Sequence, residues 1–218
     1  MISVVIPTLD AGPWIGLCLA AVAEADEIVV VDGGSTDGTA GIAERHGARV
    51  IQAPRGRGRQ LAAGAAAAGG DWLLFLHTDT LLEPGWREAA DRHAERHPGK
   101  AACFRFRLDA PGWRARLVEA GVALRVKWLG LPYGDQGLLI SRSLYERLGG
   151  FRPLPLMEDV DLVRRIGGSR LERLAVAAVT SAERWRRDGW LRRSARNLLC
   201  LALYRFGMRP ERLARLYG

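Results

Sequence analysis

The chain has 218 residues, 48% of them hydrophobic, which suffices to bury the core of one globular domain without disulfide or metal staples. Its three cysteines, Cys18, Cys103 and Cys200, lie far apart among apolar neighbours, so the pattern argues against a disulfide framework and favours reduced thiols in the cytoplasm. The net charge of +8 favours an anionic partner, whether nucleic acid, an anionic membrane surface or a phosphate-bearing substrate. Because no basic region and apolar segment open the sequence, we expect no signal peptide.

Strands and helices are expected to alternate through the first hundred residues. Strands are predicted at 3–6, 27–31, 48–52 and 72–76, and helices at about 13–24, from 35 or 36 to 46, and in the alanine-rich stretch before 69–70. Pro7 should stop the first strand, and Ser35 or Thr36 should cap the second helix. The alternation predicts βαβ units and a parallel sheet in which the unbroken apolar strand 72–76 is fully covered.

The second half of the chain continues with both element types. The pattern predicts a polar helix to about residue 97, a half-exposed strand at 101–108 and an amphipathic helix at 113–128. A loop at 131–137 and a buried strand at 138–140 should follow. The remaining predicted elements are a helix ending at 149–150, a helix opened by 157–162 and a last strand at 174–180. The carboxylates that open the helix near 158 suit its N-terminal dipole.

The stretch from Trp185 is predicted to be a basic amphipathic helix. Leu191, Ala195, Leu198 and Ala202 fall on one helical stripe with arginines along its edge. Its longest apolar run is far below the ~20 residues of a membrane-spanning helix, so the stripe either packs on the sheet or lies on an anionic membrane face. The expected organisation is a domain at 1–184, with a nucleotide-binding half of about 1–100 and an acceptor half of about 101–184, followed by this extension at 185–218.

Four polar loops should meet at one edge of the sheet, because ligands of open α/β sheets gather at the carboxyl ends of the strands. The loop that begins at Asp32 is rich in glycine and suits a nucleoside, and the arginines at 55–59 suit phosphates. Asp79 with His77 suits a divalent metal on a diphosphate. A structural alternative is that Asp79 caps the next helix and His77 packs at the strand end.

Two common nucleotide motifs do not fit. Asp32 precedes the glycines at 56–58, whereas the dinucleotide-binding fingerprint has its glycine loop first and its acid about 20 residues later. The sequence also has no P-loop lysine pattern and no glycine-flanked serine elbow.

Several segments resemble family 2 glycosyltransferases with the GT-A fold. They lie in the order and spacing typical of that family, between Ser3 and about Arg165: 4–8, 30–39, 76–80, 149–151 and the pair Glu158-Asp159. The resemblance implies an α/β, Rossmann-like, mostly parallel sheet flanked by helices. It also implies an inverting transfer, dependent on Mn²⁺ or Mg²⁺, of a sugar from a nucleotide-diphosphate sugar to an acceptor hydroxyl. The segments at 55–60, 77–80 and 131–137 are similar to a small bacterial subfamily found near radical-SAM and selenium-related genes.

The resemblance also implies roles for individual residues. Thr8 and Asp32 would line the nucleoside pocket and Asp79 would bind the metal, while Asp159, beside Glu158, would take the proton of the acceptor hydroxyl. A single in-line attack needs such a carboxylate on the acceptor side. The alternative is that Glu158 and Asp159 only stabilise a helix dipole. Further donor contacts are expected from Pro7, Asp10, Gly33, Arg55, Arg59, Gln60, His77, Thr78, Asp135 and Gln136.

Three positions depart from the family pattern. His77 replaces the first acid of the D-x-D motif, Gly33 replaces a second acid in the nucleoside loop, and Asp10 stands where many relatives have Asn-Glu. Imidazole suits manganese better than magnesium, so His77 can ligate metal, bond to a phosphate or orient Asp79.

The acceptor is not identified by the sequence. Trp113, Trp128 and Tyr133 either form an apolar acceptor wall or belong to the core. If the terminal helix touches membrane, a lipid-linked or apolar acceptor and a peripheral place on the inner face of the cell membrane are expected, and otherwise a cytoplasmic protein. A second class of function is a basic module for nucleic acid or membrane with a degenerate transferase site, but the arginines lack the aromatic platform of a single-strand binder, and no specific nucleic acid is expected.

Overall fold

The computed structural model describes residues 1–217, and its centre is β1 (Ile2–Thr8), a strand whose residues are all buried. β1 pairs in parallel with β2 (Glu27–Asp32) on one side and with β4 (Trp72–Phe75) on the other. β3 (Arg49–Gln52) adds a parallel neighbour to β2. The connecting helices are α1 (Gly12–Ala21), α2 (Thr39–Arg45) and α3 (Arg57–Ala67). The predicted βαβ units and the fourth place of strand 72–76 in the sequence are thus confirmed.

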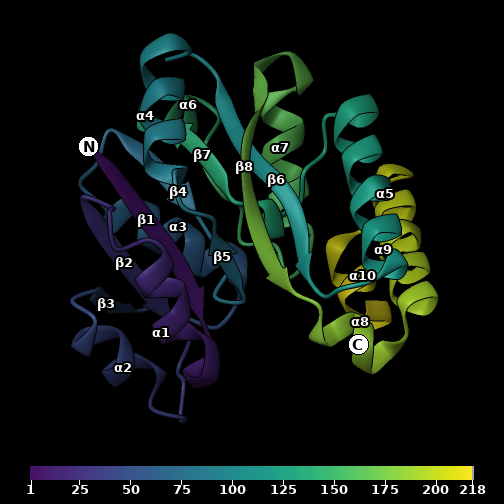
Figure 1. The fold of residues 1–218 in the computed structure, drawn as a ribbon, viewed down its shortest axis with the longest axis horizontal. Coiled ribbons are helices and arrows are strands. Elements are labelled where there is room, and N and C mark those ends of the chain that lie inside the picture. Colours follow the sequence, from purple (N-terminus) through teal and green to yellow (C-terminus); the bar gives the residue numbers. More distant parts are fainter. Residues whose placement is uncertain (218) are drawn as a thin grey trace.

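Beyond β4 the same sheet changes direction (Figure 1). β7 (Leu138–Ser141) runs antiparallel to both β4 and β6 (Ala101–Asp109), and β8 (Leu171–Ser181) is parallel to β6. A short strand that the sequence did not predict, β5 (Thr80–Leu82), pairs with β8. The order across the described sheet is β3-β2-β1-β4-β7-β6-β8-β5. The helices of this half are α4 (Trp86–Arg96), α5 (Trp113–Leu129), α6 (Arg142–Arg147) and α7 (Glu158–Ile166), with 3₁₀ turns at Gly134–Gln136 and Gly168–Arg170.

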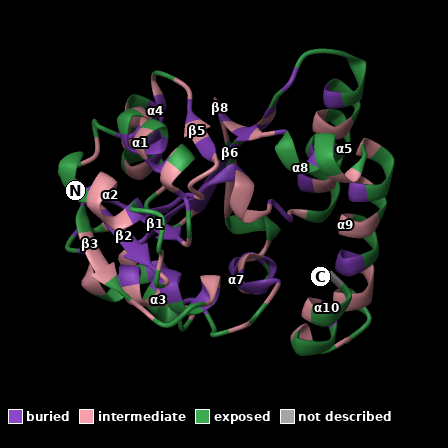
Figure 2. Cartoon of the chain, turned by 90° about the horizontal axis from the view of Figure 1, so that it is seen from below, coloured by how far each residue is buried: buried purple, intermediate pink, exposed green. Residues whose placement is uncertain are grey.

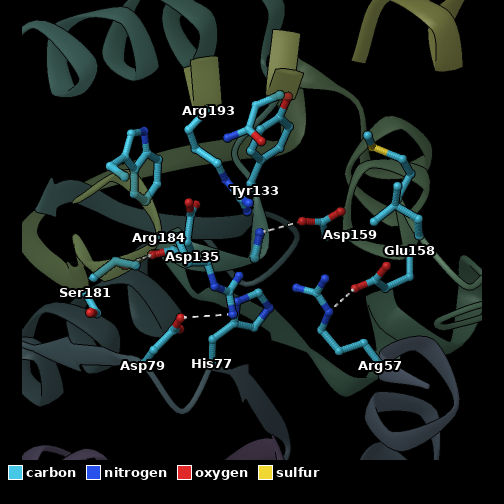
Figure 3. A pocket seen from close by; sticks show the side chains of 16 residues that line it. Arg57, His77, Asp79, Tyr133, Asp135, Glu158, Asp159, Ser181, Arg184 and Arg193 are labelled. Carbon is cyan, nitrogen blue, oxygen red and sulfur yellow. Dashed lines mark hydrogen bonds and ion pairs between the residues drawn. The ribbon is translucent and has the colours of Figure 1, made fainter. Parts of the chain in front are cut away.

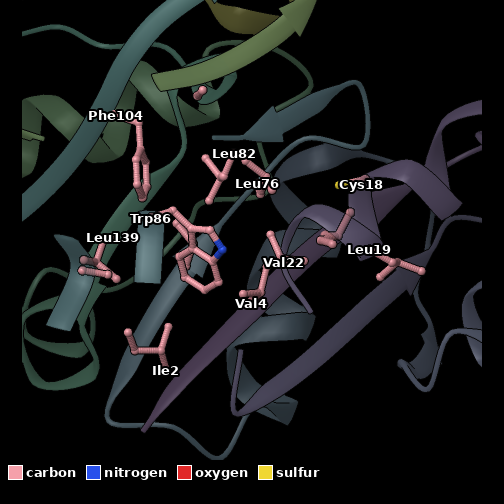
Figure 4. Close-up of a cluster of buried hydrophobic side chains, with 14 of the residues drawn as sticks. Ile2, Val4, Cys18, Leu19, Val22, Leu76, Leu82, Trp86, Phe104 and Leu139 are labelled. Atoms are coloured by element: carbon pink, nitrogen blue, oxygen red, sulfur yellow. The ribbon is translucent and has the colours of Figure 1, made fainter. Parts of the chain in front are cut away.

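The core has two sides because successive side chains of a strand point to opposite faces of the sheet. Val4 and its alternate neighbours on β1 pack with residues of α1 and α4, including Trp86, which is 1% exposed (Figure 4). Val5 packs on the other face with α3, α6 and α7. Layers on both faces explain why the central strands are continuously apolar, and they leave only the strand ends open to solvent.

Pro7 does not stop β1, contrary to expectation. The parallel pairing of β1 with β2 continues to Thr8, whereas the pairing with β4 ends at Val5. Since alternate residues of a strand present their N–H groups to alternate sides, Pro7 faces the side that β4 has already left, and its missing N–H costs no ladder bond.

The cap of α2 and the exposure of β6 also differ from expectation. The helix begins at Thr39 after Gly38, whose φ is 83°, rather than at a side-chain cap from Ser35 or Thr36. β6 is buried over its first four residues, because it lies between β7 and β8 instead of at an edge.

The C-terminal stretch forms three helices where one was expected: α8 (Glu183–Asp188), α9 (Trp190–Arg205) and α10 (Pro210–Tyr217). Of the two alternatives for the stripe, packing on the sheet is wrong, because Leu191 and Leu198 are 83% and 60% exposed while α9 buries Cys200 and Leu201. These two residues pack with Val160 of α7 in a separate apolar cluster. The side of α9 that carries Leu191 and Leu198 is therefore exposed, and Figure 2 shows exposed and half-buried residues over much of this helix. Throughout residues 1–217, every helix is too short or too polar to cross a bilayer.

Candidate active site

The carboxyl ends of β1 and β4 open into a cavity of about 720 Å³, here called the strand-edge pocket. Three of the four predicted loops contribute to its wall, as do the segment before α7 and α8. The predicted residues that line it are Pro7, Thr8, Asp10, Arg55, Gln60, His77, Thr78 and Asp79. Of the other predicted donor contacts, Asp32 and Gly33 lie behind this wall, and Arg59 is exposed outside it.

The carboxylate of Asp32 is hydrogen-bonded within its own loop. It accepts hydrogen bonds from the backbone N–H of Gly34 at 3.1 Å and of Ser35 at 3.0 Å, and a third from the Ser35 hydroxyl. Burial opposes ionisation here, but these hydrogen bonds outweigh it and lower the pKa of Asp32. Thr8 bonds to Asp32 as well, at 3.3 Å. Asp32 therefore shapes the loop that would enclose a nucleoside.

Asp10 ties the first loop to the second. Its φ is 48°, a left-handed conformation that Asp tolerates better than most residues. Its N–H donates to the Ser35 hydroxyl at 2.9 Å, and its carboxylate accepts from the N–H of Thr36 at the same distance. These hydrogen bonds join the loop that contains Asp10 to the loop that begins at Asp32.

Gln60, Thr78 and Gln136 hold backbone in place. The side-chain amide of Gln60 donates to the carbonyls of Thr8 at 2.8 Å and Val31 at 2.9 Å, which pins β1 to β2. A Cβ built on Gly33 would lie 3.1 Å from this amide, so an acidic side chain at 33 would displace Gln60. Thr78 donates to the carbonyl of Pro7 at 3.1 Å, and Gln136 to that of Phe104 at 3.1 Å. That these three side chains contact the nucleotide-sugar donor directly stays a prediction.

A smaller cavity of about 90 Å³, the central pocket, adjoins the strand-edge pocket (Figure 3). The two share a wall formed by Arg57, His77, Asp79 and Arg184. The central pocket adds the predicted residues Asp135, Glu158 and Asp159. Side chains from the loop after β4, from α3, α7 and α8, and from the 3₁₀ turn at Gly134 therefore line one cavity.

Asp159 is held by backbone N–H groups on both of its oxygens. Its Oδ2 accepts from Gly134 at 2.7 Å and its Oδ1 from Val160 at 2.7 Å. Met157, just before the pair, has a φ of 65°, which is a strained conformation for a residue with a side chain. The strained turn aims both carboxylates of Glu158-Asp159 into the pocket wall, as their place among the lining residues shows.

Glu158 is a buried acid with one cationic partner. It forms an ion pair with the Nε of Arg57 at 3.1 Å, and its side chain is only 2% exposed. Burial raises the pKa of Glu158, opposed by the nearby charge of Arg57. Glu158 thus positions Arg57 toward the pocket that both residues line.

His77 lies between Asp79 and Arg57 (Figure 3). Burial, followed by the charge of Arg57, lowers the pKa of His77 to about 4, so the ring is neutral at physiological pH. A Cβ at position 134 would collide with this ring, which explains the glycine there.

Burial also raises the pKa of Asp135 to about 6, and the Oδ1 atom of Asp135 is buried without a hydrogen-bond partner.

Asp79 is the carboxylate best placed to bind a cation together with a ligand. Its Oδ2 is 3.4 Å from Arg184, and its side chain is 21% exposed to the pockets. Within residues 1–217, no three His, Cys, Asp or Glu side chains converge as a ready-made metal site. Mg²⁺ and related ions are often held by only one or two carboxylates plus substrate phosphates, so Asp79 would be able to hold such an ion together with a diphosphate. The alternative helix-capping role of Asp79 does not fit, because β5 separates it from α4.

Arg57, Arg184 and Trp14 line these pockets but were not among the individually predicted contacts, although Arg57 is one of the arginines at 55–59 that suit phosphates. A signal for Arg57 was present. α3 begins at Arg57, not after Gln60, and residues three apart share a helix face, so Arg57 and Gln60 point inward while Arg59 points outward. Arg184 comes from the opposite half of the sheet, and no local pattern connects it to Asp79.

Solved structures share this fold and identify its class. Glucosyl-3-phosphoglycerate synthase from Mycobacterium tuberculosis, crystallised with Mn²⁺, UDP and glucosyl-3-phosphoglycerate, aligns with a TM-score of 0.60 at 24% identity, over 81% of this chain and 71% of that one. S. aureus TarS, in complex with UDP, aligns with a TM-score of 0.65 at 19% identity, over 83% of this chain and 60% of that one. The fold is therefore the GT-A fold of nucleotide-diphospho-sugar transferases, as the sequence predicted.

Sequence comparison gives the family. The profile described as "Glycosyl transferase family 2" matches residues 3–143, and the chain belongs to this family. An uncharacterized glycosyltransferase of Mycobacterium tuberculosis is 36% identical over 85 residues, 38% of this chain and 39% of that protein. A PGL/p-HBAD biosynthesis glycosyltransferase of the same species is 38% identical over 93 residues, 38% of this chain and 36% of that protein. These alignments span less than two fifths of either relative.

Proposed function

We propose that the chain transfers a sugar from a nucleotide-diphosphate sugar to an acceptor hydroxyl, with inversion at the anomeric carbon. The observation that carries the proposal is the central pocket, in which Asp79 and Asp159 face one cavity beside His77. Asp79 also lines the strand-edge pocket, whereas Asp159 does not, so the two carboxylates stand at different places in the wall of the central pocket. Carboxylates at separate places in one cavity suit a reaction in which a leaving group and an attacking hydroxyl are held apart across one carbon.

On the donor side, the joined loops of Asp10 and Asp32 would enclose the nucleoside, with Trp14 and Thr8 in the wall. Arg57 and Arg184 would lie against the diphosphate, since both line the wall between the two pockets. Mn²⁺ or Mg²⁺ at Asp79 would neutralise charge that develops on the diphosphate as its bond to the sugar breaks. His77, being neutral, would hydrogen-bond to a phosphate or orient Asp79 without adding charge. Pro7, Arg55 and Thr78 complete the proposed donor contacts in this wall, whereas the predicted residues Gly33, Arg59 and Gln136 lie outside it.

On the acceptor side, Asp159 would act as the general base. The two backbone N–H groups fix the plane of its carboxylate and leave the remaining lone pairs for the acceptor. The acceptor hydroxyl gives its proton to Asp159, its oxygen bonds to the anomeric carbon, and the nucleoside diphosphate leaves with the electrons of the broken bond. Glu158 contributes by holding Arg57, and Asp135 by contacting the acceptor or the sugar.

Finer assignments belong to the same proposal. A hexose is the proposed sugar, the radical-SAM-associated subfamily the proposed branch of the family, and the cytoplasm the proposed location, with peripheral contact at the membrane. The acceptor half of the chain, about residues 101–184, and the extension at 185–218 would supply the acceptor surface. The apolar character of that surface supports an apolar or lipid-linked acceptor.

Calorimetric titration with a panel of uridine, guanosine and thymidine diphosphate sugars, with Mn²⁺, with Mg²⁺ and with EDTA, tests the donor and the metal together. We expect at least one donor to bind, and Asp79→Asn to weaken its metal-dependent binding about tenfold or more, since a charged ligand is lost. Asp91→Asn, on the exposed side of α4, is the matched control and should change nothing. Absence of binding for every donor contradicts the proposed function, and equal binding by Asp79→Asn with and without metal contradicts the role of Asp79.

A further inference from the structure

A long groove runs between α5 and α9 on the acceptor side of the molecule. Its volume is about 970 Å³, and we call it the α5–α9 groove. The two helices lie side by side in both views of the chain (Figures 1 and 2). The apolar side chains that line it include Trp113, Leu117, Val122, Trp190, Leu191 and Leu198.

The inner end of the groove meets the central pocket. Tyr133, Asp135, Trp185 and Asn197 line both cavities. The guanidinium of Arg125 stacks on the ring of Tyr133 at 3.5 Å from its centroid, which fixes the aromatic wall at the junction. A molecule lying in the groove therefore has its end at the same acids that the transfer reaction uses.

The rims of the groove expose large apolar side chains. Trp113 is 71% exposed and Leu117 59% exposed on α5, and they face a comparable row on α9. A contiguous apolar surface of this kind, continuous with a catalytic pocket, marks a binding site for an apolar ligand more often than a solvated surface. The apolar side chains of the lining provide contacts for a hydrocarbon chain, and the arginines among them provide contacts for an anionic group.

The charge around the groove is strongly positive. Residues 183–218 contain ten arginines and three acidic residues, so they account for seven of the eight net positive charges of the chain. α5 adds four basic residues against one acid. Arg114, Arg186 and Arg192 themselves line the groove. Arginine beside tryptophan and leucine on one helix face is the composition that binds the interface of an anionic membrane.

We propose that the acceptor is an anionic phospholipid with a free hydroxyl in its headgroup, bound with its hydrocarbon chain in the α5–α9 groove and its headgroup at Tyr133 and Asp135. The inference rests on the proposed function, because it names the acceptor of the same site. The headgroup hydroxyl gives its proton to Asp159, its oxygen forms the bond to the anomeric carbon, and the nucleoside diphosphate leaves. Arg125, which lines the groove and stacks on Tyr133, lies beside the phosphate that joins the headgroup to the chain, and the exposed leucines and tryptophans enter the membrane surface.

A groove-filling variant tests where the chain binds. Gly121 lines the groove on α5, and a Cβ there would meet no atom within 4 Å, so Gly121→Trp fills the groove without strain. Gly41→Trp on α2 is a matched helical control, because its Cβ would contact only the flexible end of Arg45. The probe is monomeric lysophosphatidylglycerol, titrated in a calorimeter. We expect wild type and Gly41→Trp to bind it alike, Gly121→Trp to bind at least about tenfold more weakly, and glycerol phosphate to bind about a hundredfold more weakly.

Vesicle co-sedimentation provides a second readout that does not depend on one variant folding. Wild type should sediment with vesicles of phosphatidylcholine containing phosphatidylglycerol and not with phosphatidylcholine alone. Leu198→Glu on the rim should lose most of this binding, while Leu17→Glu, equally exposed on α1, should keep it. Failure of lysophosphatidylglycerol to bind, equal binding by Gly121→Trp, or a wild-type dimer that Leu198→Glu dissociates would overturn the inference.

The same titrations separate the two proposals. If a nucleotide-diphosphate sugar binds and the lysolipid does not, the lipid acceptor is wrong and the transferase proposal stands. If the lysolipid binds in the groove and no nucleotide-diphosphate sugar binds, the groove remains a lipid site but the acceptor role fails with the proposed function.

Discussion

The strand-edge pocket and the α5–α9 groove lie on opposite sides of one cluster of acids, and they are built differently. Gln60 and Thr78 in the wall of the strand-edge pocket, and Asp32 behind it, already use their hydrogen-bonding groups on neighbouring backbone. In the groove, apolar side chains such as Leu191 and Trp113 stand in solvent with no protein cover. The strand-edge pocket is therefore preorganised, whereas the apolar side chains of the α5–α9 groove would become buried only when a ligand binds.

This difference separates two kinds of recognition. A preorganised polar pocket loses little entropy on binding and can select a nucleotide by fixed donors and acceptors. An apolar groove recognises by area and shape and tolerates variation in its ligand. We infer that the chain is selective for its donor and permissive for the length of the hydrocarbon chain of its acceptor.

Asp159 stands where the two regions meet, and its removal should have the largest effect. Asp159→Asn keeps the size of the side chain and removes the base, so turnover should fall about 10²–10⁴-fold. Donor affinity should stay at the wild-type value, because the nucleoside and diphosphate contacts are untouched. Release of nucleoside diphosphate and calorimetric donor binding measure the two quantities, with Glu95→Gln on the exposed face of α4 as control. Turnover retained by Asp159→Asn would remove Asp159 as base.

Arg57 tests whether the donor side is as preorganised as its contacts indicate. Arg57→Met leaves Glu158 as a buried acid without its ion pair, which should lower the free energy of unfolding by about 1–3 kcal/mol at neutral pH. It should also weaken donor binding about tenfold, because the positive charge that would face the diphosphate is removed. Urea denaturation and donor titration give both values, and Arg92→Met, exposed on α4, is the matched control. Wild-type stability together with wild-type donor affinity would contradict both roles of Arg57.

Asp135 at the inner end of the groove should have a smaller, pH-dependent effect. Its pKa is raised from 3.8 to about 6 by burial, so the folded chain keeps a proton that the unfolded chain releases. The retained proton favours the folded state at low pH, and the free energy of unfolding therefore falls as the pH rises from about 4 to about 6. Asp135→Asn should match wild type at about pH 4 and exceed it by on the order of 1–3 kcal/mol at neutral pH. Urea denaturation at both pH values checks this, and an equal difference at the two would show that Asp135 is not held protonated.

The sequence predicted the fold around the strand-edge pocket well because its signals are local. Alternating strands and helices, glycine-rich loops and the segment 76–80 specify neighbouring strands, and parallel strands bring their carboxyl ends together. The roles of Gln60 and Thr78 were less visible, since a polar residue in a loop has the same pattern whether it binds ligand or backbone. Gly33 illustrates the same limit, because only the position of Gln60 explains why no side chain fits there.

The acceptor side could not be predicted to the same degree. Arg184 reaches Asp79 across more than a hundred residues of sequence, and β5 pairs with β8 over a similar separation. The stripe at Leu191 and Leu198 had the right helical period, but periodicity does not say which apolar face packs inward. α9 buries Cys200 and Leu201 because α10 and α7 offer them a complementary surface.

The stereochemistry of the released sugar tests the central claim most directly. Proton NMR can follow the hydrolysis of an α-linked nucleotide-diphosphate sugar, with water in place of the acceptor and before the free sugar equilibrates. A single displacement assisted by Asp159 predicts that the β anomer appears first and that Asp159→Asn suppresses its formation. First appearance of the α anomer would contradict the single displacement, and hydrolysis at the wild-type rate in Asp159→Asn would contradict the site as described.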